Sequence, residues 1–159
     1  MNELNQSTKI KTEANIGDRI VAGIVDYIII LTFSIFYVTS FGLQNSEGVY
    51  SVSGLPALIP FLFWGIMTIG FEQWFGATLG NLLVGLKAIS ILGNEKKLTF
   101  GQSIKRHLLD PIDMSFLGLV GIVTIKNSKQ HQRVGDIWAN TIVVKKSELN
   151  KTHGNTVYN

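Results

Sequence analysis

The amino-acid sequence predicts an α-helical membrane protein with three apolar segments and a small cytoplasmic β-element. Hydrophobic residues make up 46% of the 159 positions and charged residues 16%, and most of the apolar residues lie in three long blocks. Lys and Arg are absent from the connection between the first two blocks and frequent in the segments around the others. Two short runs rich in β-branched residues are typical of strands. These three observations together favour helices in a bilayer with a small sheet on one side.

The first apolar block, residues 20–41, is long enough to cross a bilayer. Asp26 is the one charge in its 22 residues. At ~1.5 Å of rise per residue, a helix of this length spans about 33 Å, against a hydrocarbon core of ~30 Å. The 19 residues before it are mostly polar. We therefore expect a retained anchor rather than a cleavable signal peptide.

The second block, residues 55–75, carries no charge before Glu72 and ends in the aromatic run FEQWF, which suits the headgroup level. The connection between the first two blocks has no Lys or Arg, whereas the flanking segments are basic. Because cytoplasmic loops are enriched in these residues, we expect a cytoplasmic N-terminus and an outside first connection. The cytoplasmic positive residues would be Lys9, Lys11, Arg19, Lys87, Lys96, Lys97, Lys105 and Arg106.

The third block, about residues 104–125, allows two interpretations. A single ordinary crossing would place the basic C-terminal tail outside, against the charge rule. A broken, returning helical hairpin, interrupted near Pro111, would keep that tail cytoplasmic. Residues 85–100 read as a strand, a Gly-Asn turn and a possible second strand, and residues 140–146 as another strand. Pairing of these runs would favour the returning segment.

One membrane domain, residues 15–146, is predicted, with flexible tails at 1–14, on the cytoplasmic side, and at 147–159. The absence of cysteine excludes disulfides and thiolate metal sites. No His, Asp or Glu spacing matches a metal site, and no nucleophile–histidine pair or phosphate-binding loop is present. We therefore expect no enzyme, no cofactor, no metal and no nucleic-acid partner.

Charged residues in or beside the apolar blocks are the candidate functional residues, because a charge in a bilayer is expensive. Arg19 and Asp26 lie seven residues apart on one helix stripe, about 10 Å apart along the axis. They are too distant to pair with each other. We therefore expect Arg106 or Arg133 to face Asp26, and Asp110 or Asp136 to face Arg19. The candidate cluster is Arg19, Asp26, Arg106, Asp110, Arg133 and Asp136.

Three further residues are secondary candidates: Glu72, Asp113 and His107. The two carboxylates would line an ion route if there is one. His107 could belong to a proton relay, but a solvated histidine at the membrane interface is the favoured interpretation. Trp138 is expected to be an interfacial anchor.

At these residues the sequence resembles the RDD family of small membrane proteins, named for an arginine and two aspartates. The residues that carry the likeness are Arg19, Asp26, Arg106, Asp110 and Asp136, with the element QRVGDIWANTIVV around the last and GATLGN (76–81) after the second block. The resemblance covers roughly residues 15–146. Ala77 and Asn81 stand where the family commonly has proline and lysine. If that lysine binds lipid phosphate or a partner, this chain lacks the contact.

The resemblance implies a multi-pass protein, which we expect in a prokaryotic plasma membrane, from a family that is mostly uncharacterised. Ion or proton antiport has been proposed for some members. Cation- or proton-coupled transport by a homo-oligomer would use Asp26 as its site. A structural clasp, meaning ion pairs that fix one helix arrangement, is favoured over a functional ion site. A non-transporting accessory or assembly subunit is the third possibility. Its basic face would meet anionic lipid or another membrane protein and comprises Lys87, Lys96, Lys97, Lys105, Lys145 and Lys146.

Overall fold

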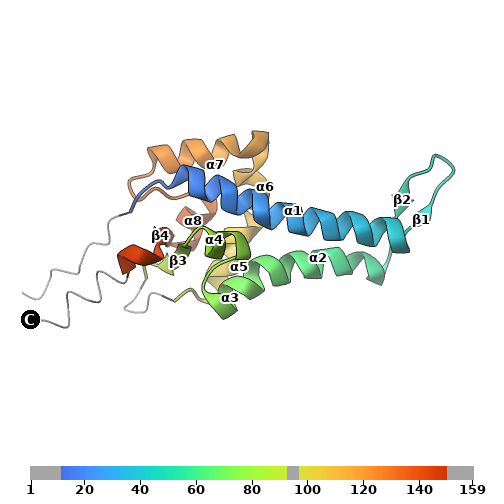
Figure 1. The fold of residues 1–159 in the computed structure, drawn as a ribbon, viewed down its shortest axis with the longest axis horizontal. Coiled ribbons are helices and arrows are strands. Elements are labelled where there is room, and N and C mark those ends of the chain that lie inside the picture. Colours follow the sequence, from blue (N-terminus) through green and yellow to red (C-terminus); the bar gives the residue numbers. More distant parts are fainter. Residues whose placement is uncertain (1–11, 93–96, 150–159) are drawn as a thin grey trace, which may run out of the picture.

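The computed structural model describes residues 12–92 and 97–149, and it combines two long apolar helices with a smaller region at one end (Figure 1). The first helix is α1 (Ile16–Phe41), which ends in an antiparallel hairpin of β1 (Leu43–Gln44) and β2 (Tyr50–Ser51). The second is continuous over 21 residues and consists of η1 (Leu55–Ala57), α2 (Leu58–Gly65), the π-helical η2 (Ile66–Gly70) and α3 (Phe71–Phe75).

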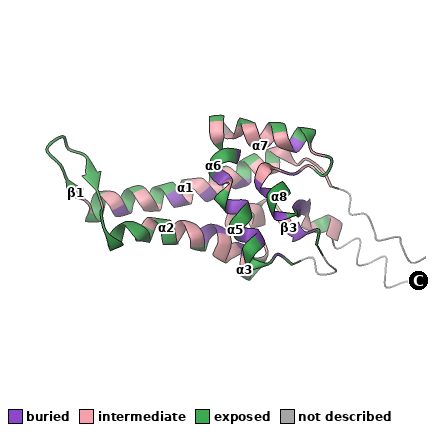
Figure 2. Cartoon of the chain, turned by 180° about the vertical axis from the view of Figure 1, so that it is seen from behind, coloured by how far each residue is buried: buried purple, intermediate pink, exposed green. Residues whose placement is uncertain are grey.

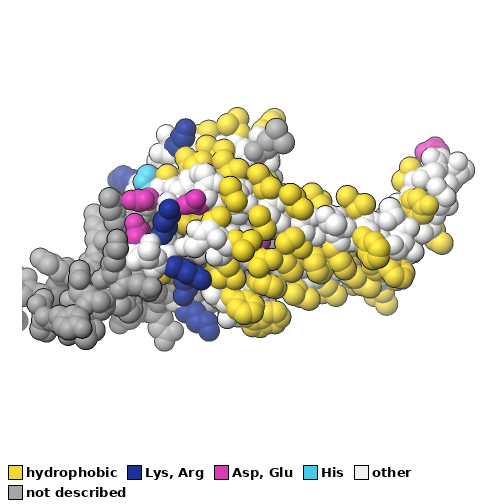
Figure 3. All heavy atoms as spheres, in the orientation of Figure 1, with side chains coloured by type: hydrophobic (Ala, Val, Ile, Leu, Met, Phe, Trp, Pro, Cys, Tyr) yellow, Lys and Arg dark blue, Asp and Glu magenta, His cyan; other side chains and the backbone are white. Residues whose placement is uncertain are grey.

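Both long helices are apolar and long enough to cross a membrane. They contain 26 and 21 residues, with mean hydropathies of 2.1 and 1.5. Phe33 and Phe63 stack between them with ring centroids 3.9 Å apart. Hydrophobic side chains cover their visible surface from the hairpin to the charged end (Figure 3). The sequence prediction of membrane helices is confirmed to this extent, although α1 begins four residues earlier than the apolar block because its first turn includes Asp18 and Arg19.

The remaining elements lie at the end of the long helices away from the hairpin (Figure 1). They are α4 (Leu79–Leu83), β3 (Leu86–Ser90), α5 (Phe100–Leu108), α6 (Asp110–Asp113), α7 (Ser115–Asn127), α8 (Val134–Ala139) and β4 (Thr141–Lys145). This end contains most of the buried residues, whereas the hairpin end of the long helices is largely exposed (Figure 2).

The β-element forms as predicted between the two runs expected to pair. Strands β3 and β4 are antiparallel, from Leu86 opposite Lys145 to Ser90 opposite Thr141. Their side chains contribute to two small apolar clusters. The possible second strand in residues 85–100 is wrong, because Thr99 caps α5 through a reciprocal bond with Gln102 and commits the chain to a helix. The expected Gly-Asn turn lies outside the described residues.

The third apolar segment is broken. Helical residues Phe100–Asp113 and Gly118–Asn127 meet at 114°, so the described residues contain two candidate spans, or three if this bent pair counts as one. The break does not lie at Pro111, which occupies the first turn of α6, where a missing N–H is tolerated. It lies later, where Phe116 and Gly118 both adopt positive φ.

Helix α5 has the reverse of the polarity usual in soluble proteins. Its inward face is polar and its outward face is apolar, with Phe100, Ile104 and Leu108 exposed. The inward residues are Gln102, Ser103, Arg106 and His107. Such a helix suits an apolar environment outside the protein and a polar one inside it. Beside it, Lys105 lies over the half-exposed ring of Trp138, with Nζ 5.8 Å from the ring centroid.

Candidate functional site

Asp136 is the carboxylate on which three arginines converge. Its side chain is fully buried near the start of α8, where it accepts a hydrogen bond from the backbone N–H of Arg133 at 3.2 Å. It pairs with Arg106, with Arg19 Nη1 at 3.3 Å and with Arg133 Nε at 3.8 Å. The expectation that a later aspartate faces Arg19 is therefore met by Asp136.

The arginines keep Asp136 ionised. Burial alone would raise the pKa of the Asp136 carboxyl. The guanidinium groups of Arg106, Arg133 and Arg19 lower this pKa by more than burial raises it, so it lies below its usual range. The carboxylates in turn keep the Arg133 guanidinium protonated. Burial lowers the pKa of its guanidinium, but the carboxylates of Asp110, Asp136 and Asp113 raise it above the usual value. Both groups are therefore charged at neutral pH.

Arg106 connects the second long helix to α8. Its side chain is 2% exposed. Nε lies 3.2 Å from Glu72 Oε1, while Nη1 pairs with Asp136 and donates to Thr141 Oγ1 at 3.1 Å. Gly135 permits this arrangement, because a Cβ there would meet the Arg106 backbone, its Cα 3.2 Å away. Glu72, a secondary candidate in the sequence, is thus a buried partner of Arg106.

His107 is buried between two carboxylates, so the expectation of a solvated interfacial histidine is wrong. It is 3% exposed, with Nδ1 at 2.9 Å from Asp110 Oδ2 and Nε2 at 3.5 Å from Glu72 Oε2. The polar face of α5 points inward and carries the ring with it. A neutral imidazole has one ring nitrogen without a proton, whereas the imidazolium has a proton on each. Two facing carboxylates therefore favour the imidazolium.

Asp110 and Asp113 complete the cluster around Arg133. Asp110 Oδ1 lies 2.8 Å from Arg133 Nη1, and its Oδ2 accepts from the Tyr27 hydroxyl at 3.2 Å. Asp113 accepts from the backbone N–H groups of Val134 and Gly135 at 2.9 and 3.1 Å, and lies 3.7 Å from Arg133 Nε. These contacts hold α6 against the start of α8.

The eight titratable side chains that form these buried ion pairs are called the charge cluster below, and their charges balance. With His107 as imidazolium, four cations face four carboxylates. The members are Arg19, Glu72, Arg106, His107, Asp110, Asp113, Arg133 and Asp136.

Asp26 does not join the charge cluster, and the expectation that an arginine faces it is wrong. Its side chain is buried, at 7% exposure, and Oδ1 accepts from the backbone N–H of Gly80 at 2.7 Å. Within residues 12–92 and 97–149 it makes no ion pair. Asp26 faces the Gly80 N–H instead of an arginine because α4 approaches α1 closely. Gly80 packs on the backbone of Ala22, one turn before Asp26, and so directs its amide at the carboxylate.

Thr78 and Gly80 were not predicted as site residues, although both lie in the GATLGN run. Thr78 caps α4, because its hydroxyl accepts from the Asn81 N–H, and both threonine and glycine are preferred at such positions. A capping threonine followed two residues later by glycine was the available signal, but a backbone donor leaves no charge pattern to find.

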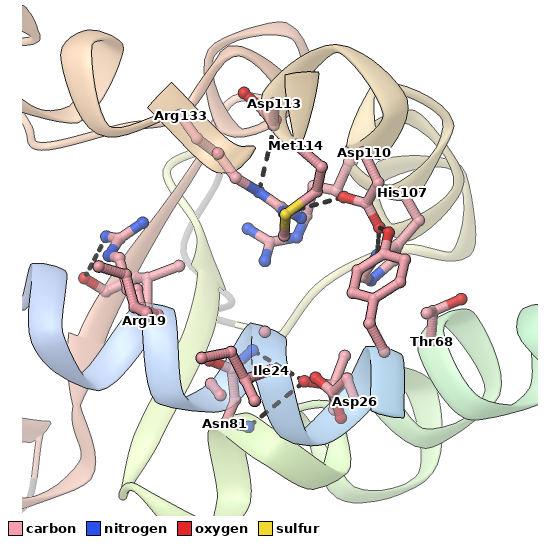
Figure 4. A pocket seen from close by; sticks show the side chains of 18 of the residues that line it. Arg19, Ile24, Asp26, Thr68, Asn81, His107, Asp110, Asp113, Met114 and Arg133 are labelled. Atoms are coloured by element: carbon pink, nitrogen blue, oxygen red, sulfur yellow. Dashed lines mark hydrogen bonds and ion pairs between the residues drawn. The ribbon is translucent and has the colours of Figure 1, made fainter. Parts of the chain in front are cut away.

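A cavity of about 490 Å³ adjoins Asp26 and the charge cluster. Figure 4 shows Asp26 and Ile24 of α1 on one side, with Met114 and Arg133 on the other. The Asp26 side also includes Tyr27, Thr78 and Asn81. The structure thus separates the predicted site into a paired charge cluster and a carboxylate beside a cavity.

Gly80→Ala is expected to destabilise the protein, because the added Cβ would meet the Ala22 backbone, with the Ala22 Cα only 2.9 Å away. Overpacking of this kind typically costs ~1–3 kcal/mol. Thermal melting of the detergent-solubilised protein, followed by size-exclusion chromatography, measures the effect. The matched control is Gly17→Ala in α1, where a Cβ meets nothing within 4 Å. Equal melting temperatures for the two variants would contradict the close approach.

Comparison with known proteins identifies a family. The model of the RDD family matches residues 13–140, which include every member of the charge cluster as well as Asp26 and Gly80. No curated protein and no solved structure matches the chain.

Proposed function

The chain belongs to the RDD family, and we propose that it is a multi-pass membrane protein that holds a proton or a small monovalent cation at Asp26, as one step of cation- or proton-coupled transport. The observation that carries the proposal is a buried carboxylate that has no cationic partner among the described residues and lies beside a cavity. The charge cluster next to it is already balanced.

Electrostatics support a proton or cation at this carboxylate. An ionised carboxylate at the centre of a bilayer costs roughly 2.5–3.5 kcal/mol on insertion scales. The hydrogen bonds from the Gly80 N–H and the Thr78 side chain stabilise the Asp26 carboxylate but supply no opposite charge. Because the charge cluster is neutral, none of its cations is left over for Asp26. A bound proton or monovalent cation would remove the uncompensated charge, whereas a divalent ion would leave an excess of one positive charge.

The charge cluster itself fits the structural clasp. Its ion pairs connect α1 through Arg19, the second long helix through Glu72, and α5, α6 and α8 through Arg106, Asp110 and Asp136. Buried pairs of this kind often specify one arrangement without adding net stability. We assign them the role of holding the walls of the cavity in place, and we assign the exchangeable charge to Asp26 alone.

The proposed orientation places the N-terminus and the sheet of β3 and β4 in the cytoplasm and the hairpin of β1 and β2 outside. In this arrangement α5, α6 and α7 enter the membrane and return. The apolar outward face of α5 supports this path, as does the bend near Phe116 and Gly118. A single chain with two straight helices is small for alternating access. The transporting unit would therefore be a homo-oligomer in a prokaryotic plasma membrane.

A second candidate function is an accessory or assembly subunit without transport. The balanced charge cluster supports it, because a paired cluster needs no exchangeable ion. Exposed lysines, among them Lys97, Lys105 and Lys126, would then meet anionic lipid or a partner protein.

The test is proton and Na⁺ flux in vesicles reconstituted with the purified protein. Asp26→Asn keeps the shape of the side chain and removes its charge, so it is expected to fold and to abolish a cation-driven proton flux seen in the parent. The matched control is Asp18→Asn, which removes a carboxylate from the same helix at a half-exposed position. Unchanged flux in Asp26→Asn would reject Asp26 as the transport site, and a parent without flux would favour the accessory subunit.

A further inference from the structure

The cavity beside Asp26 is far larger than a proton or a bare metal ion requires. Its volume of about 490 Å³ lies within the range of ~300–1,000 Å³ found for pockets that hold organic ligands. A site for a small inorganic cation would instead surround it closely with oxygen ligands. Apart from the carboxylates, the oxygen atoms that the lining offers come from a few neutral side chains on several elements, those of Tyr27, Thr68, Thr78 and Asn81.

Most of the wall is apolar. Helix α1 contributes isoleucines and Tyr27, and the opposite wall contributes Met114 and Ile122. Figure 4 shows Met114 directed into the cavity from the side opposite Ile24. Apolar walls stabilise a ligand by removing its apolar surface from water, and an aromatic ring such as that of Tyr27 attracts a cation through its face. A hydrated inorganic ion gains little from either.

The sign of the charge that a ligand in the cavity should carry follows from the charges of the surrounding side chains. The charge cluster is balanced and Asp26 adds one negative charge. The charged residues that line the cavity therefore carry one net negative charge only together with Glu72 and Asp136, the carboxylate partners of Arg106, which do not line it. An anionic amphiphile would increase this imbalance, whereas a monovalent cation would remove it. In a poorly solvated site, the difference in electrostatic free energy between binding a cation and binding an anion is larger than in water.

We propose that the cavity beside Asp26 binds a lipophilic organic monocation, with its charge at the Asp26 carboxylate and its apolar body between α1 and the α6–α7 wall. The inference rests on the proposed function and specifies its substrate class. Residues of α1 and α7 line opposite sides of the cavity, and the two helices lie alongside each other in Figure 1. A lipophilic cation that partitions into the bilayer would therefore enter between them.

The test measures binding of tetraphenylphosphonium to the purified full-length protein in detergent by equilibrium dialysis. Saturable binding is expected, and Asp26→Asn should weaken it by at least about tenfold, equivalent to ~1.4 kcal/mol. Lowering the pH should also weaken it, because protons compete for the same carboxylate. On α7, Ile122→Trp fills the cavity and should reduce binding, whereas Val123→Trp, at an exposed position on the same helix, should not.

Three results would overturn the inference. Equal binding of tetraphenylphosphonium by the parent and Asp26→Asn, or equally tight binding of the isosteric anion tetraphenylborate, would mean that the cavity takes any apolar body. Absence of tetraphenylphosphonium binding in a parent that shows Asp26-dependent proton or Na⁺ flux would reject the organic cation and leave the proposed function intact. Conversely, Asp26-dependent binding without any flux would support the site and reject transport.

Discussion

Asp136→Asn is expected to remove most of the folded protein, the largest effect of any single substitution in the charge cluster. The asparagine preserves shape but supplies no negative charge to Arg19, Arg106 and Arg133, which meet at this side chain. Breaking a buried ion pair by removing one partner typically costs ~3–5 kcal/mol, against a total stability of ~5–15 kcal/mol for a domain. Here one substitution affects three buried cations at once.

Folded yield and melting temperature in mild detergent measure this effect, and Asp18→Asn provides the comparison. Asp18 pairs with Lys145 at 3.0 Å, but both side chains are about 40% exposed, at 39% and 41%. Exposed pairs contribute little to stability because solvent screens them. Asp18→Asn should therefore melt like the parent. A parent-like melting temperature for Asp136→Asn would show that the arginines do not depend on this carboxylate.

The pH dependence of the parent tests the same carboxylate if the variant yields no folded protein. The pKa of Asp136 is below its ordinary value of 3.8 in the folded state. A carboxyl with a lowered pKa contributes stability that is fully present above the unfolded value and is lost as the pH falls from there to the folded value. The parent should therefore remain folded at pH 5 and lose stability only below about pH 4. A melting temperature that already falls between pH 7 and 5 would implicate a different group.

The membrane architecture could be predicted because it depends on patterns that are local in the sequence. An uninterrupted apolar run from Ile20 to Phe41 allows little but a long helix in an apolar environment. The β-branched residues of 141–144 likewise identify strand β4. The partner of Arg19 could be narrowed to two aspartates, because a buried guanidinium requires a carboxylate and few are available in the chain.

The side-chain environments of His107 and Asp26 could not be predicted in this way. The polar residues of α5 and α6 recur at helical spacing, which indicates that they share one helix face. The spacing does not indicate whether this face points to water or to the protein interior. His107 was therefore predicted to be solvated, although it is buried in the protein. Asp26 was assigned an arginine because opposite charges are visible in a sequence, whereas its actual partner is the backbone N–H of Gly80. Such a donor exists at almost every residue and becomes specific only when two helices approach each other.

Arg106→Lys is expected to be nearly as damaging as the loss of one ion pair, although the substitution conserves charge. Arg106 presents Nε to Glu72 and Nη1 to Asp136. The lysine ammonium is a single compact charge and cannot reproduce this planar fork. One of the two buried carboxylates would lose one of its cations, an effect of the order of the ~3–5 kcal/mol that breaking a buried ion pair costs.

Glu72→Gln should destabilise the parent and stabilise Arg106→Lys. In the parent it removes a carboxylate that faces both Arg106 and His107, whereas in Arg106→Lys it removes a charge that the lysine does not balance while it pairs with Asp136. Melting temperatures of the parent, both single variants and the double variant form a complete cycle. Additive effects would mean that Arg106 does not couple the second long helix to α8. A change of sign would show that this residue balances two carboxylates at once, which is the property that leaves none of its charge for Asp26.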